Sequence, residues 1–247
     1  MFRATAERYI RPSAAGVELA EALDELQTEG LQRSRDDGGS ENEAEGQQVD
    51  DVTEVSPGIV LTSTTPTMVL DARTSVTHPK LLAVGNQSDY FIHSVIWPRM
   101  GKDRWALVGG ETNENTRCSN TSAKWHVYDT KNYRKTKTLK EVDSLSFTNG
   151  VYADGKPAVN GLGCSSHWFN EHPTWKDGGV VALGAYEHGT RFLTVNSKGK
   201  IAEVGWFCPF GGSTSASYWI TPKIVYNVEY TRGIDILKYT GPLRAAG

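Results

Sequence analysis

The sequence predicts an all-β fold: a partial β-propeller of about three blades plus closing strands of another, with a mostly disordered acidic N-terminal segment. The stretch 180–195 repeats 44 residues later as 224–239, with Tyr186 matching Tyr230 and Gly189 matching Gly233. A repeat period in the forties is typical of a propeller blade, which is a four-stranded unit. Glycine is frequent, at 25 of 247 residues, and helix-favouring runs are almost absent after residue 35. This composition also favours strands and turns.

Charge and aromatic content divide the chain near residue 55. Residues 1–55 hold 14 acidic and 5 basic side chains, whereas residues 56–247 have a net charge of +6 and contain all seven tryptophans. We therefore expect residues 1–55 to be acidic and largely disordered, because such a segment buries too little apolar surface to order itself. Residues 56–247 are expected to form the propeller blades.

One helix is predicted inside the acidic segment, at residues 14–33. Leu19, Leu23 and Leu26 recur at i, i+4 and i+7, which is the spacing of one helical face. The helix is expected to be marginal, because a short apolar stripe is stable only when it packs against another surface.

Short apolar runs separated by Gly, Pro and Asn follow from residue 58 onward. The expected strands are 58–61, 67–71, 80–84, 91–97, 105–110, 124–129, 137–142, 167–170, 180–183, 192–196, 200–205, 216–220, 224–228 and 234–239. The order "strand with a histidine, Pro/Gly turn, apolar strand, Gly" occurs at His93 and again at His167. A closed propeller needs at least about four blades. We therefore expect a fragment of a longer protein, or self-association that closes the ring.

Three strand ends resemble the Leu-Val-Ile-Val-Asp strand of the LVIVD-repeat β-propellers: Val69-Leu70-Asp71, Val127-Tyr128-Asp129 and Thr194-Val195-Asn196. The resemblance covers about residues 67–240 and no part of residues 1–55. It implies a bacterial secreted or cell-surface protein without an assigned activity, whose partner is a protein or another cell-surface ligand. The first eight residues lack the apolar core of a signal peptide, so no export signal is expected in this chain.

Several function classes are not supported by the sequence. It has no run of about 18 apolar residues, which predicts no membrane span. The basic stretch from Arg134 to Lys140 is too short for a nucleic-acid surface. No Gly-x-Ser-x-Gly nucleophile elbow is present. The favoured function is a non-catalytic binding module.

A metal-dependent enzyme is the alternative, with His93, His167, Glu171 and His188 as candidate metal ligands. His93 and His167 occupy corresponding places in their repeat units, and imidazoles that converge on an axis suit Cu, Zn or Fe. Inner-strand histidines are similarly placed in the selenium-binding, methanethiol oxidase-type propellers, which implies an oxidase. Against it, no His-Glu-x-x-His spacing is present. We expect structural histidines whose rings lie a blade's width apart.

Of the three cysteines, Cys118 and Cys164 each lie in a Gly/Asn/Ser-rich loop, one blade apart. They are a disulfide candidate if the chain meets an oxidising compartment, and unpaired thiols otherwise. Cys208, between Phe207 and Pro209, is expected to be a packing residue.

Overall fold

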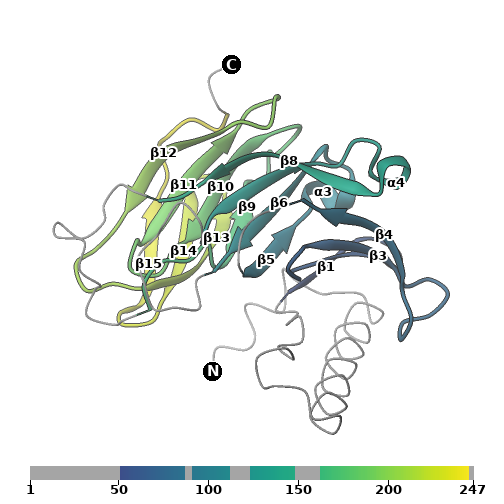
Figure 1. The fold of residues 1–247 in the computed structure, drawn as a ribbon. Coiled ribbons are helices and arrows are strands. Elements are labelled where there is room, and N and C mark those ends of the chain that lie inside the picture. Colours follow the sequence, from purple (N-terminus) through teal and green to yellow (C-terminus); the bar gives the residue numbers. More distant parts are fainter. Residues whose placement is uncertain (1–50, 87–90, 112–122, 148–161, 245–247) are drawn as a thin grey trace, which may run out of the picture.

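The computed structural model describes residues 51–86, 91–111, 123–147 and 162–244, which are almost entirely strands and turns (Figure 1). The strands are β1 (Val52–Ser56), β2 (Ile59–Thr62), β3 (Met68–Asp71), β4 (Lys80–Gly85), β5 (Ile92–Ile96), β6 (Trp105–Gly110), β7 (Trp125–Asp129), β8 (Thr138–Leu145), β9 (Phe169–Glu171), β10 (Gly179–Gly184), β11 (Thr190–Val195), β12 (Ile201–Phe207), β13 (Thr214–Thr221), β14 (Ile224–Glu229) and β15 (Gly233–Lys238). Two single helical turns, α3 (Pro98–Gly101) and α4 (Tyr133–Thr136), lie in connections. No helix of the described residues is long and apolar enough to cross a membrane.

The strands form four successive antiparallel groups, which we call blades 1 to 4. Blade 1 is β1–β4, blade 2 is β5–β8, blade 3 is β9–β12 and blade 4 is β13–β15. Within a blade each strand pairs with the next along the chain. A short parallel pairing of β4 with β8 joins blades 1 and 2 into one eight-stranded sheet. In Figure 1 the blades follow one another from blue through teal and green to yellow.

The first strands of successive blades lie side by side. The Thr53 hydroxyl on β1 donates to the Val95 carbonyl on β5 at 2.6 Å, and Trp168 forms a parallel bridge with Ala216 on β13. The Ser94 hydroxyl on β5 donates to the carbonyl of His167, immediately before β9. Successive first strands are therefore neighbours, as the inner strands around a propeller axis are.

Three apolar clusters hold neighbouring blades together. Trp105, Trp125 and Leu183 belong to the cluster between blades 2 and 3 and are fully buried. Equivalent clusters join blade 1 to blade 2, and blade 3 to blade 4. Because each blade buries its apolar side chains against the next one, most of the free energy of burial comes from contacts between repeats.

Two glycines explain why successive first strands approach so closely. Gly109 is the last but one residue of β6 and Gly184 ends β10, the second strands of blades 2 and 3. A Cβ atom on Gly109 would clash with the Ser166 carbonyl, and one on Gly184 would lie 2.7 Å from the backbone of Ser215. Glycine is required because the next blade's backbone occupies the place of a side chain.

The predicted all-β partial propeller is confirmed, with one difference in detail, in blade 1. The repeat at 180–195 and 224–239 corresponds to β10–β11 and β14–β15, so the two halves are equivalent hairpins. Blade 1 has a complete set of four strands, because β1 begins at Val52, inside the segment predicted to be disordered. The predicted helix at 14–33 lies outside the described residues.

Candidate functional site

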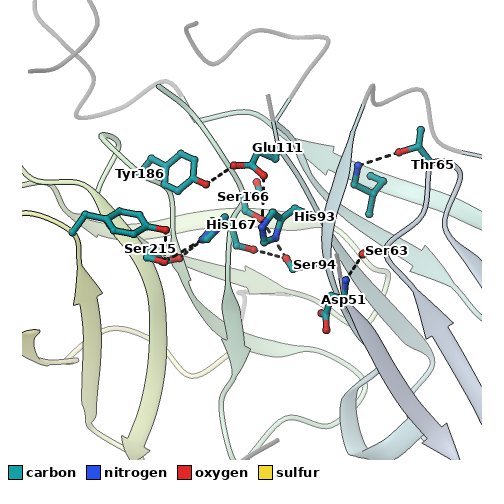
Figure 2. A network of polar contacts seen from close by, with 12 residues as sticks. Asp51, Ser63, Thr65, His93, Ser94, Glu111, Ser166, His167, Tyr186 and Ser215 are labelled. Atoms are coloured by element: carbon teal, nitrogen blue, oxygen red, sulfur yellow. Dashed lines mark hydrogen bonds and ion pairs between the residues drawn. The ribbon is translucent and has the colours of Figure 1, made fainter. Parts of the chain in front are cut away.

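Three polar side chains from blades 2 and 3 converge where the first strands begin. His93 lies on β5, Glu111 directly follows β6, and His167 lies just before β9. The Glu111 amide donates to the Phe91 carbonyl at 2.9 Å, and Glu111 forms an antiparallel bridge with Ser165. The side chains of the three residues lie close to one another in Figure 2.

The distances within this group are those of direct neighbours. The ring centroids of His93 and His167 are 4.0 Å apart, and His93 Nε2 lies 3.6 Å from Glu111 Oε2. One donor atom from each of the three residues lies within 4.8 Å of the other two. We call His93, Glu111 and His167 the axial cluster.

Hydrogen bonds orient two of the three members (Figure 2). His167 Nδ1 lies 2.7 Å from the Ser215 carbonyl oxygen on β13. Since a carbonyl can only accept, this nitrogen carries the proton, and His167 Nε2 keeps its lone pair. The Tyr186 hydroxyl donates to Glu111 Oε1, which leaves Oε2 on the side of His93.

Burial keeps both imidazoles neutral. It lowers the pKa of His93 to about 3, and the charge that His167 would carry contributes in the same direction. Burial also lowers the pKa of His167 to about 4, against the opposing effect of the hydrogen bond to Ser215. The pKa of Tyr186 is raised, first by burial and then by its hydrogen bond to Glu111. At neutral pH the group therefore offers two neutral rings and a carboxylate to a cation.

The predicted ligand set is only partly brought together. His93 and His167 are in contact, so the expectation that their rings lie a blade's width apart is wrong. Glu171 and His188 are not part of the axial cluster. Glu171 lies on β9, where burial and the charge of Asp103 raise its pKa to about 7. His188 is buried beside Arg191, and burial lowers its pKa to about 4.

The sequence analysis missed Glu111, although the repeat contains a signal for it. Glu111 follows β6, Tyr186 follows β10 and Tyr230 follows β14, so the three residues hold equivalent positions in blades 2, 3 and 4. Glu111 and Tyr186 also make matching antiparallel bridges to the chain entering the next blade. Extending the Tyr186–Tyr230 match to the preceding blade would have identified Glu111 as a residue facing the axis.

The cysteines are described in part. Cys164 is buried and disulfide-bonded, and Cys208 is a free, half-buried thiol whose Sγ lies 3.2 Å from the Glu187 carbonyl. Burial raises the pKa of the Cys208 thiol. Cys118 lies outside the described residues, so its pairing with Cys164 stays a prediction.

A second feature lies on blade 4, whose outward face is apolar and exposed. Its members pair across strands, Tyr226 with Ile236 and Val228 with Ile234. These four side chains, together with Ile220 on β13, are between 36% and 63% exposed. We call these five residues the last-blade face.

The fold and these contacts define the class: the chain is a β-propeller protein. No family model and no curated protein matches it. Among solved structures it is similar to the β-propeller domain of Cps50 (Swd1) from Myceliophteria thermophila, at 15% identity with a TM-score of 0.54. The match covers 81% of this chain and 57% of that chain, so this chain spans just over half of the matched structure. This likeness concerns the fold alone.

Proposed function

We propose that the chain is a non-catalytic interaction module, similar to the LVIVD-repeat propellers, and that a second copy of itself binds to the last-blade face. The observation that carries this proposal is the incomplete fourth blade. Blades 1 to 3 have four strands each, whereas blade 4 has three, of which β15 has no neighbour beyond β14 among the described residues.

The two faces of blade 4 differ in their surroundings. On one face, Trp219 and Val225 are buried against blade 3 in the third apolar cluster. The other face is equally apolar, but it carries the exposed Tyr226, Ile234 and Ile236. Since every other blade boundary in the described structure is an apolar contact between two sheets, this face has the character of such a boundary without its second sheet.

A second copy of the chain can cover both the last-blade face and the outer edge of β15. The β15 strand presents unpaired backbone groups next to apolar side chains, which favours pairing with another strand. Most homo-oligomers form by such a self-complementary, two-fold contact.

Self-association is tested by measuring molecular mass against concentration. Sedimentation velocity and light scattering of the full chain should show a dimer that dissociates on dilution. Ile236→Lys, at the centre of the last-blade face, should shift the protein to the monomer. Met100→Lys is the matched control, because Met100 is 72% exposed in the turn between β5 and β6. A wild-type monomer over the whole concentration range would overturn the proposal.

We also infer an extracellular or cell-surface location. The bonded state of Cys164 supports it, since disulfides persist mainly in oxidising compartments. The resemblance to the LVIVD-repeat proteins agrees with this location. A histidine-liganded metalloenzyme is the second candidate, favoured by one observation, the contact between His93 and His167.

A further inference from the structure

We propose that His93, Glu111 and His167 bind one divalent first-row transition-metal ion at the propeller axis. The donors come from blades 2 and 3, so the site is separate from the last-blade face, and either proposal can fail without the other. The argument rests on donor chemistry, on spacing and on the contacts that hold each side chain.

The donor chemistry fits a transition metal better than the alkaline-earth ions. Two imidazoles and one carboxylate are ligands typical of Zn²⁺, Fe²⁺ and Cu²⁺ sites, whereas Ca²⁺ and Mg²⁺ prefer oxygen donors alone.

The spacing is close to that of a coordination sphere. Two donors bound at 2.0–2.1 Å to a tetrahedral ion lie about 3.4 Å apart. His93 Nε2 and Glu111 Oε2 are separated by 3.6 Å, too far for a hydrogen bond but close to that ligand spacing. The third donor lies within 4.8 Å, so a side-chain adjustment of about 1 Å closes the set.

Two hydrogen bonds from neighbouring groups hold His167 and Glu111 in orientations that suit metal ligands. His167 donates through Nδ1 to the Ser215 carbonyl, which fixes the ring and leaves Nε2 for a metal. Tyr186 holds one oxygen of Glu111 and leaves the other facing His93. A histidine that binds a metal through one ring nitrogen usually makes a hydrogen bond through the other nitrogen.

His93 supplies the remaining observation. Its side chain is only 12% exposed, and its Nδ1 has no hydrogen-bond partner within the described structure. The His93 ring contacts the rings of His167 and Trp168 instead. With a metal at Nε2 the neutral ring keeps its proton on the unpartnered Nδ1, so the metal would be the polar contact that fixes this ring.

The experiment titrates Zn²⁺ into chelator-treated, dialysed full-length protein by isothermal calorimetry. We expect one ion per chain, no comparable binding of Ca²⁺ or Mg²⁺, and a loss of affinity of more than about 100-fold in His93→Ala and His167→Ala. Tyr186→Phe keeps the ring but removes the hydroxyl that holds Glu111, so it should weaken binding about 10-fold. His172→Ala is the control, because both His172 nitrogens have partners elsewhere, Thr174 and the Pro222 carbonyl.

A second measurement avoids variants that fail to fold. Electron spin-echo modulation of the Cu²⁺ complex of the wild-type protein should show the remote nitrogens of two imidazoles. Absence of stoichiometric Zn²⁺ uptake by the wild type would overturn the proposal. So would uptake that survives in folded His93→Ala and His167→Ala proteins, or a Cu²⁺ signal without imidazole nitrogens.

Discussion

The half-buried carboxyl of Glu171 is a source of pH-dependent stability. Burial raises its pKa from 4.5 to about 7, so between these values the folded protein holds a proton that the unfolded chain has lost. By linkage, this group makes the free energy of unfolding fall as pH rises from about 4.5 to 7. The shift corresponds to about 3 kcal/mol at pH 8.

Glu171→Gln should remove this penalty. We expect the variant to be more stable than the wild type by up to about 3 kcal/mol at pH 8, and equally stable at pH 4, where both states carry a neutral side chain. Urea unfolding at the two pH values measures the difference. A gain that is the same at both pH values would show that the carboxyl's ionisation is not its cause.

For individual site residues, the sequence was informative only where the repeat marked equivalent positions. The repeat plan gave His93 and His167 corresponding places, and their rings lie 4.0 Å apart rather than a blade's width apart. Glu171 and His188 were named as further candidate ligands, and they lie outside the axial cluster. Residue type and proximity along the chain do not decide which way a side chain faces, whereas register does.

Gly184, the glycine that ends β10, is expected to be sensitive to substitution although it lies at a strand end. Gly184→Ala would place a methyl group 2.7 Å from the backbone of Ser215, which cannot move aside as a flexible side chain can. We expect a loss of about 1–3 kcal/mol in the free energy of unfolding, typical of overpacking. Chemical denaturation provides the measurement.

Gly205→Ala is the matched control, because it also places a methyl group on a strand glycine, in β12. Its Cβ would meet only the Phe192 ring, at an ordinary contact distance of 3.9 Å. This variant should be neutral or slightly stabilising. Equal losses in the two variants would indicate a general requirement for glycine in strands rather than a close approach of blades 3 and 4.

Elements with a strong apolar pattern were predictable, and elements that depend on a neighbouring sheet were not. The hairpins β10–β11 and β14–β15 follow from the repeat at 180–195 and 224–239. Strand β1 was missed because its sequence, Val52-Thr53-Glu54-Val55-Ser56, continues the acidic composition before it. Its pairing with β2 and its contact with β5 outweigh this weak local propensity.

For the molecule as a whole, the number of blades is a property that periodicity cannot settle. The repeat identifies the blade as the structural unit. Because the loops between blades differ in length, the number of blades cannot be counted from a fixed period. The described strands form four blades, and among the described residues no further strand pairs with the outer edge of β15.

The predicted Cys118–Cys164 bridge connects the chain leaving β6 with the chain entering β9, and so ties blade 2 to blade 3. Closing a loop of this length should stabilise the fold by about 4 kcal/mol, chiefly by restricting the unfolded chain. Mass spectrometry after maleimide labelling in denaturant should find one labelled thiol, Cys208, without reductant and three with it. Three labelled thiols in unreduced protein from an oxidising host would contradict both the bridge and the location inferred from it. Cys208→Ser should then carry no label unless reduced, which separates the free thiol from the bonded pair.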